Sequence, residues 1–193
     1  TDIAVISIGG VVVSSTIKVA GDAFDQAIMS YIRKTHSLFI GSDTAEAIKI
    51  KIGTAIEEAN PQVMEVKGRN VLTGLPKKVK LTSEEIREAL KDATGQIVEA
   101  VHGVLEKTPP ELAADVAKNG ILLTGGGSML RGLAGYIAGE LHVDVAIAPD
   151  PINCVARGTA ASLTLGQYLT AGFRDATPRA WHNRLQSPEG FSN

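Results

Sequence analysis

Three consecutive glycines, Gly125, Gly126 and Gly127, stand between an apolar run and a helical pattern in the segment ILLTGGGSMLRGL. A glycine turn from a strand into a helix brings free backbone N–H groups to the positive end of the helix dipole. Such a turn suits a phosphate group, or a nucleoside that lies flat against the backbone. On spacing alone, a ligand loop and a plain tight turn are equally good interpretations.

The familiar nucleotide-binding motifs do not match this segment in full. The chain has no Gly-Lys-Ser or Gly-Lys-Thr, so the P-loop pattern is absent. The dinucleotide pattern G-x-G-x-x-G starts at Gly125 but has Leu130 where its third glycine belongs. The same leucine breaks the hydrolase pattern G-x-S-x-G. Asp150, after the next predicted strand, could imitate a ribose-binding acid and keeps a Rossmann oxidoreductase as a weaker alternative.

Two charged residues, Glu46 and Lys49, are three positions apart and share one face of a predicted helix. Spacing alone favours an exposed ion pair, which contributes little to stability. Cys154 stands at the start of the last predicted helix, where a small buried apolar residue is the better interpretation. We expect no metal site, because the four histidines are far apart in the chain: His36, His102, His142 and His182.

The composition, with 193 residues, 44% of them apolar, and a net charge of -2, is that of a soluble globular protein. This charge gives no signature of nucleic-acid binding. The single cysteine excludes an internal disulfide, and no apolar run approaches the ~20 residues that span a bilayer. The chain starts at Thr1, within a strand-like run and without a signal peptide, so we expect it to be the C-terminal piece of a longer protein.

The sequence pattern of residues 1–53 predicts a β-hairpin followed by two helices. The segment IAVISIGGVVVSSTIKVAG has two β-branched runs around Gly9-Gly10, a dipeptide that suits a tight turn. Asp22 is the expected N-cap of the first helix. Asp43 and Glu46 form a capping pair at the start of the second helix, and Gly53 is its expected stop.

The middle of the chain predicts a second hairpin, with strands at Val63–Lys67 and Lys77–Leu81, and then a long helix. Thr82 and Glu85 form a capping box, and the helix ends before Pro109-Pro110. The hairpin has a basic face that is either solvated or meets an acidic partner. Its basic residues are Lys67, Arg69, Lys77, Lys78 and Lys80.

The last part of the chain alternates helices and strands, which predicts an α/β fold. The expected order is a helix at 111–120, a strand at 121–124, a helix to about Leu141, a strand at 143–147 and a helix at 153–169. The segment 39–81 interrupts the alternation and is expected to form a small inserted α+β subdomain. No period is sustained after Thr170, so residues 171–193 are expected to be a disordered tail.

Five segments, in order, resemble the MreB family of bacterial actins: AVISIGGVVVSSTIKVAGDAFDQAI, TAEAIKIKIG, VKGRNVLTGLPK, PPELAADVAKNGILLTGGGSMLRGL and DPINCVARGTA. The resemblance covers about Thr1 to Leu169 without large gaps. It implies the actin-like ATPase fold of actin, Hsp70 and the sugar kinases, which is ribonuclease H-like and holds a nucleotide between two similar domains. The chain resembles the second domain, with residues 1–38 and 82–170 as its core and 39–81 as its inserted subdomain.

The resemblance also implies a binding site for ATP or ADP. The loop that binds the adenosine corresponds to Gly125, Gly126, Gly127 and Ser128. The helix that borders the adenine and ribose from the other side corresponds to Glu46, Ala47, Ile48 and Lys49. By this resemblance, Glu46 accepts a hydrogen bond from a ribose hydroxyl and Lys49 covers a ring face.

The groups that act on the phosphates belong, in this family, to the other half of the protein. They are the two phosphate loops, the carboxylate that positions the attacking water, and most of the contacts to Mg²⁺. Phosphoryl transfer depends on such positioning and charge stabilisation. We therefore expect no catalytic residue in this chain and no ATPase activity from it alone.

The function implied by the resemblance is that of an ATP-dependent cytoskeletal filament that guides cell-wall synthesis and so maintains rod shape. The expected partners are further copies of the protein, cell-wall elongation proteins and, through the other half, the inner membrane, under which the protein would lie in the cytoplasm. An Hsp70-like chaperone or a sugar kinase of the same fold is the alternative. The chaperone is disfavoured because only a short polar segment follows Leu169.

Overall fold

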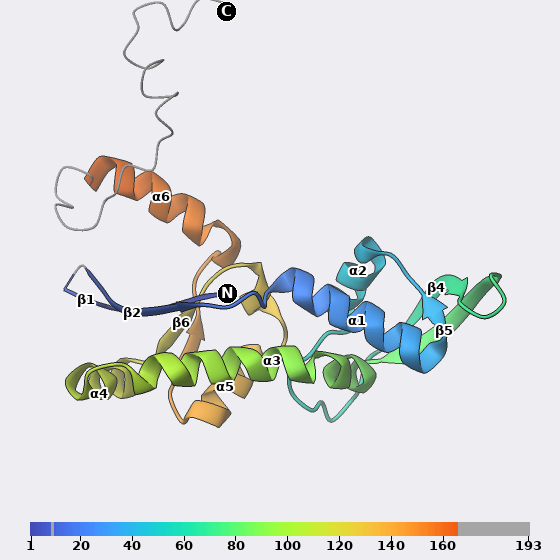
Figure 1. The fold of residues 1–193 in the computed structure, drawn as a ribbon, viewed down its shortest axis with the longest axis horizontal. Coiled ribbons are helices and arrows are strands. Elements are labelled where there is room, and N and C mark those ends of the chain that lie inside the picture. The colour runs from blue at the N-terminus through green and yellow to red at the C-terminus, as the bar shows by residue number, and fades with distance from the viewer. Residues whose placement is uncertain (9, 166–193) are drawn as a thin grey trace, which may run out of the picture. The chain divides into compact units, whose positions relative to one another are not determined.

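The computed structural model describes residues 1–8 and 10–165, which contain three small sheets and the helices between and after them (Figure 1). The chain divides into two units, Thr1–Ala156 and Arg157–Asn193. The sheets, the core and the candidate site all lie in the first unit. The expected tail at 171–193 and the predicted end of the last helix lie outside the described residues.

The first sheet is the predicted hairpin, made of β1 (Asp2–Ser7) and β2 (Gly10–Thr16). Its turn is not where the sequence predicts it, because Ser7 pairs with Gly10 and Ile8 takes a positive φ of 50°. Val5 pairs with Val13 whereas the next residue pairs with Val11, so one residue of β2 is extra. This bulge moves the turn one residue towards the N-terminus. Gly9 lies outside the described residues.

Two helices follow, α1 (Gly21–His36) and α2 (Ser42–Ile52), and both begin earlier than their predicted caps. The N-caps are Ala20 and Gly41, and neither has a side-chain cap hydrogen bond. Asp22 and Asp43 therefore lie inside the first turns, where their charges still favour the helix dipole. The predicted capping roles of both aspartates are wrong, whereas the stop at Gly53 is confirmed, since its N–H donates to the carbonyl of Lys49.

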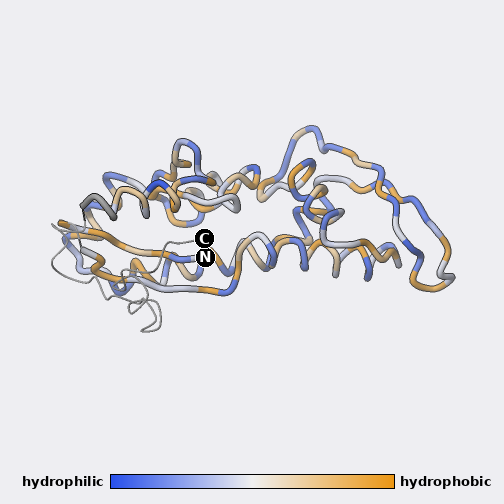
Figure 2. Tube along the Cα trace, turned by 90° about the horizontal axis from the view of Figure 1, so that it is seen from above, coloured by the Kyte–Doolittle hydropathy of each residue, from blue (hydrophilic) through white to orange (hydrophobic). Residues whose placement is uncertain are grey.

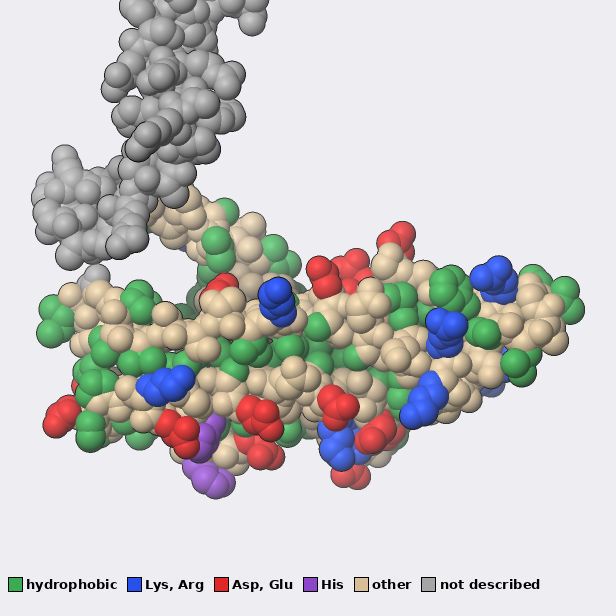
Figure 3. Space-filling model, in the orientation of Figure 1, with side chains coloured by type: hydrophobic (Ala, Val, Ile, Leu, Met, Phe, Trp, Pro, Cys, Tyr) green, Lys and Arg blue, Asp and Glu red, His purple; other side chains and the backbone are tan. Residues whose placement is uncertain are grey.

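The second sheet has the order β3-β4-β5 and is antiparallel throughout. Its strands are β3 (Leu38–Phe39), β4 (Val63–Asn70) and β5 (Pro76–Thr82), so the predicted hairpin is confirmed and is longer than expected. Lys and Arg side chains gather over this sheet in Figure 3. Arg69 stacks over the ring of Phe39 at 5.5 Å, and Lys78 pairs with Glu65 at 3.0 Å. The basic face is therefore partly paired within the sheet.

The longest helix, α3 (Ser83–Glu106), begins with the predicted capping box of Thr82 and Glu85. It buries one apolar stripe, which includes Ile86, Leu90 and Ile97. Helix α4 (Pro110–Asn119) follows after a short break. It ends at Gly120, whose φ of 83° is a conformation that glycine adopts easily.

The third sheet consists of β6 (Ile121–Leu123) and β7 (Val145–Ile147), which are parallel and are connected through α5 (Leu133–Leu141). This strand–helix–strand unit is the predicted α/β element. It is followed by a 3₁₀ turn, η2 (Pro151–Asn153), and by α6 (Cys154–Leu165).

The sequence predicts that the glycine triplet leads directly into a helix, and this prediction is wrong. The triplet enters a 3₁₀ turn, η1 (Gly126–Met129), and Leu130 then takes an extended conformation with ψ of 124°. The next residue, Arg131, forms a parallel bridge with Thr54. The chain is extended here because it pairs with the segment that follows α2, and α5 begins only at Leu133.

One hydrophobic core joins α1, α2, α3, α5 and the second sheet, with residues of β1, β6 and β7 packed against it. Figure 2 shows hydrophobic and hydrophilic stretches alternating along the chain. The predicted insert contributes Ile48, Ile52 and Leu81 to the same cluster that contains Phe24 and Ile28 of α1. The division into a core and an inserted subdomain stays a prediction. Among the described residues, no helix combines the length and the apolar character that crossing a membrane requires.

Candidate functional site

A cleft of about 670 Å³ opens between α2 and the glycine turn. Its walls come from the start of α1, one face of α2, the segment around η1, and η2. These four places are far apart in the sequence, and the fold brings them together. The lining residues are Gly21, Asp22, Phe24, Asp25, Ser42, Asp43, Glu46, Lys49, Ile50, Gly126, Gly127, Met129, Leu130, Arg131 and Ile152.

Helix α2 presents a single face to this cleft. Glu46, Lys49 and Ile50 line it, at the i, i+3 and i+4 spacing of residues on one side of a helix. The side chain of Ile48 is completely buried in the core instead, and Ala47 is exposed outside the lining. Of the four predicted helix residues, the helix geometry brings only Glu46 and Lys49 to the cleft.

The glycine turn likewise contributes two of its four predicted residues. Gly126 and Gly127 line the cleft, whereas Gly125 and Ser128 do not. Gly125 has a φ of 82°, and its N–H donates to the carbonyl of Pro151. The buried hydroxyl of Ser128 donates to the carbonyl of Gly125 at 2.7 Å. Gly125 and Ser128 therefore fix the shape of the turn, and the two middle glycines face the cleft.

Neither the backbone nor the packing requires glycine at positions 126 and 127. Neither residue has a positive φ, and a Cβ atom on Gly126 or Gly127 would have no neighbouring protein atom within 4 Å. A methyl group at either position would occupy open space beside the cleft. The absence of side chains leaves the backbone of the turn bare on this side, so a ligand can approach it closely.

Lys49 is held by an acidic partner that the sequence did not predict. Its Nζ lies 2.9 and 3.0 Å from the two carboxylate oxygens of Asp25 on α1, and 3.4 Å from the carbonyl of Gly21. The side chains of Lys49 and Asp25 are only 16% and 13% exposed. Since these residues are 24 positions apart in the chain, no local spacing could reveal the pair. The charge of Lys49 is therefore balanced inside the protein.

The cleft as a whole is acidic. Figure 3 shows acidic side chains grouped over α2. The four carboxylates of the lining are Asp22, Asp25, Asp43 and Glu46, against the two cations Lys49 and Arg131. Like charges repel more strongly in a partly buried site than in water. This part of the cleft disfavours a polyphosphate and suits a neutral group with hydroxyl donors.

Besides Ile50 on α2, two further exposed apolar side chains line the cleft, and none of the three was predicted as a site residue. Met129 is 55% exposed and Ile152 is 62% exposed, and both line the cleft. Met129 follows the predicted loop directly, so its position in the sequence was a usable signal, whereas Ile152 lies in η2. Apolar side chains of this kind can cover the face of an aromatic ring.

The α/β fold, in which a glycine turn and a polar helix face each other across a cleft, is that of the actin-like class. The family model for the MreB/Mbl protein matches residues 1–169. The cell shape-determining protein Mbl of Bacillus cereus is 51% identical over 163 residues, which are 84% of this chain and 49% of that protein. The chain belongs to the MreB/Mbl family.

Solved structures agree with this membership. MreB5 of Spiroplasma citri bound to ADP has a TM-score of 0.82 and 42% sequence identity, over 89% of this chain and 52% of that one. The MamK double helical filament has a TM-score of 0.70 at 25% identity, over 86% of this chain and 50% of that one. The expected actin-like fold is thus confirmed, and the family match decides against the chaperone, sugar-kinase and oxidoreductase alternatives. The chain spans about half the length of the curated relatives it matches.

Proposed function

We propose that this cleft binds the adenosine part of ATP or ADP and that the chain is the nucleoside-binding half of a filament-forming cell-shape protein. The observation that carries the proposal is the pair Gly126 and Gly127. Both line the cleft, and neither is required by its backbone conformation or by a protein neighbour. A ligand that presses against the backbone is the remaining physical reason for glycine there.

The lining supplies a partner for each part of an adenosine. Met129 and Ile152 offer apolar surface to the base, and the backbone of 126–127 offers a wall free of side chains. Glu46 is exposed on the facing helix, where its carboxylate can accept hydrogen bonds from ribose hydroxyls. The alkyl stem of Lys49 can contact a ring face while its Nζ stays paired with Asp25.

The phosphates would lie away from this acidic lining. The four carboxylates repel them, so groups outside the described cleft must hold them, together with Mg²⁺. Binding of the adenosine by this chain and of the phosphates elsewhere agrees with the expectation that the phosphate loops and the Mg²⁺ contacts belong to the other half of the family's proteins. The resident nucleotide would therefore be shared between two domains, and closing them would link nucleotide state to polymer contacts.

The wider role follows from the relatives. Mbl and MreB are named cell shape-determining proteins, and MamK was solved as a double helical filament. The whole protein would assemble with further copies of itself in the cytoplasm, peripheral to the inner membrane. There it would guide cell-wall elongation proteins and so maintain rod shape. The membrane contacts are assigned to the half that this chain does not contain.

Calorimetric titration of the 193-residue chain with ADP tests the proposed site. We expect binding by the unaltered chain and a loss of at least ~tenfold in affinity for Gly127→Ala, which corresponds to about 1.4 kcal/mol. Gly139→Ala is the matched control, because Gly139 also has open space around its Cβ position but lies in α5, outside the cleft lining. Equal ADP affinities for the two variants would overturn the assignment of the glycine turn.

A further inference from the structure

The two walls of the cleft are tied together where Arg131 meets the segment that follows α2. Nε of Arg131 donates to the carbonyl of Gly53 at 3.1 Å, and Nη1 lies 3.0 Å from Oε1 of Glu58. The backbone is joined at the same point, since the N–H of Ala55 donates to the carbonyl of Arg131 at 2.8 Å beside the bridge to Thr54. We call this set of contacts the Arg131 joint.

The Arg131 joint lies at the end of both walls that face the ligand. Arg131 comes two residues after Met129, the last residue of the glycine turn, and it also lines the cleft. Gly53 caps α2, which carries Lys49 and Glu46. These residues are about 6 and 10 Å back along the helix axis, at a rise of ~1.5 Å per residue. A shift at the joint therefore moves the face of α2 relative to the glycine turn.

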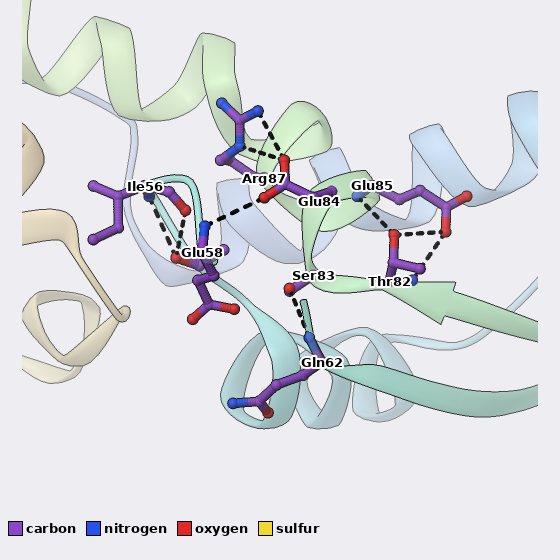
Figure 4. A network of polar contacts seen from close by, with 9 residues as sticks. Ile56, Glu58, Gln62, Thr82, Ser83, Glu84, Glu85 and Arg87 are labelled. Carbon is purple, nitrogen blue, oxygen red and sulfur yellow. Dashed lines mark hydrogen bonds and ion pairs between the residues drawn. The ribbon is translucent and has the colours of Figure 1, made fainter. Parts of the chain in front are cut away.

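The joint also rests on the start of α3. The N–H of Glu58 donates to Oε1 of Glu84 at 3.4 Å, a contact that Figure 4 shows beside Ile56 and Gln62. With its amide oxygen turned towards the guanidinium, Gln62 accepts from Nη1 of Arg131 and donates to the carbonyl of Lys51 at 3.2 Å. The joint is thus anchored on an element outside the cleft, which gives it a fixed support.

We propose that Arg131 is a positioning residue that sets the spacing between α2 and the glycine turn, and with it the fit of the nucleoside; the part that concerns ligand affinity rests on the function proposed above. A guanidinium suits this task because its rigid fork bonds to two acceptors at once, here the carbonyl of Gly53 and the carboxylate of Glu58. A lysine ammonium is a point charge and cannot hold both acceptors in one plane.

Two measurements on the full 193-residue chain test the inference: ADP affinity by calorimetry, and amide hydrogen exchange in segments 42–53 and 126–131. For Arg131→Met we expect faster amide exchange in both segments and about tenfold weaker ADP binding, because walls that are no longer held at a fixed spacing open more often and are less preorganised for the nucleoside. Arg131→Lys should give an ADP affinity and exchange rates between those of the unaltered chain and Arg131→Met. It replaces Arg131→Met in the test if the methionine variant does not fold. The exchanged pair Arg131→Glu with Glu58→Arg should recover part of the affinity.

Lys78→Met is the control. Lys78 also pairs with a glutamate, Glu65, at the same 3.0 Å as Arg131 and Glu58, but it lies in β5, outside both the Arg131 joint and the cleft lining. Exchange and affinity in Arg131→Met that equal those of Lys78→Met would overturn the positioning role. If the unaltered chain binds no ADP, the proposed function fails, and the exchange of the two segments still decides whether Arg131 holds the walls together.

Discussion

Nζ of Lys49 lies 2.9 Å from Oδ1 of Asp25, and this ion pair joins α2 to α1 inside the cleft. Both side chains are largely buried, so each charge depends on the other for its solvation. The pair places Lys49 along the cleft wall and balances its charge there. This one ion pair therefore holds α1 and α2 together and also sets the charge balance of the cleft.

Removing both members of this pair should cost less stability than the two single removals added together. Lys49→Met leaves the carboxylate of Asp25 without its counter-charge, and we expect a loss of about 2 kcal/mol in the free energy of unfolding. The double variant with Asp25→Asn should lose less than the sum of the single losses, because no buried charge is then left alone. Urea denaturation of the three variants measures this coupling.

The exposed pair between Lys78 and Glu65 is the control, since both side chains are about half exposed. Lys78→Met should leave the urea midpoint unchanged. Strict additivity of Lys49→Met and Asp25→Asn would show that the two residues do not interact in solution.

The isolated chain should release no phosphate from ATP. The lining of the cleft has four carboxylates, and its two cations, Lys49 and Arg131, are already paired with Asp25 and Glu58, so it offers little charge to stabilise a transferred phosphoryl group. A steady-state phosphate-release assay checks this, with Mbl of Bacillus cereus, full length, as the reference. Turnover comparable to that of the full-length protein would contradict the assignment of catalysis to the other half.

Ile48 and Ile50 lie on different sides of α2, so replacing each by alanine should affect the free energy of unfolding very differently. Ile48 is completely buried, so Ile48→Ala should lower the free energy of unfolding by about 2–5 kcal/mol through lost burial and a cavity. Ile50 is 71% exposed and lines the cleft, so Ile50→Ala should change stability by less than ~0.5 kcal/mol. Thermal or urea denaturation measures both, and comparable losses would mean that α2 faces the core differently.

Features that depend on a few neighbouring residues could be predicted from the sequence. The capping box of Thr82 and Glu85 is one, because its donors and acceptors are three residues apart. The strand–helix–strand unit around the glycine triplet is another, because its periodicity is local. By contrast, the helix around Glu46 was predicted with the wrong cap, since Gly41 starts it earlier without any side-chain signal.

The site could be predicted only where the sequence marks a whole segment. The resemblance marked 46–49 and 125–128 as continuous runs, but a helix turns 100° per residue, so Ile48 faces the core while Glu46 faces the cleft. The partners that complete the site, Asp25 and Arg131, meet their contacts across 24 and 78 residues of chain respectively. Such contacts are a property of the tertiary fold, and no spacing rule reveals them.

Glu85 should make the stability of the protein depend on pH below neutrality. Burial disfavours the charged carboxylate, but the hydrogen bonds from Thr82 and His36 outweigh it and hold the pKa of Glu85 below its ordinary value near 4.5. Figure 4 shows its bonds to Thr82. Because the folded pKa is the lower one, the unfolded chain binds more protons in this range. The stabilisation is therefore complete above the unfolded pKa and is lost as the pH falls through the folded pKa.

Urea denaturation of the unaltered chain and of Glu85→Gln between about pH 7 and pH 3 measures this contribution. The difference in free energy of unfolding between the two should shrink as the pH falls, because the unaltered carboxyl becomes protonated and resembles the amide. Thr82→Ala removes one of the bonds to the carboxylate and should cost about 1 kcal/mol at neutral pH while flattening the pH dependence. A difference between Glu85→Gln and the unaltered chain that stays constant over the whole range would mean that the hydrogen bonds to Glu85 do not favour its charged form.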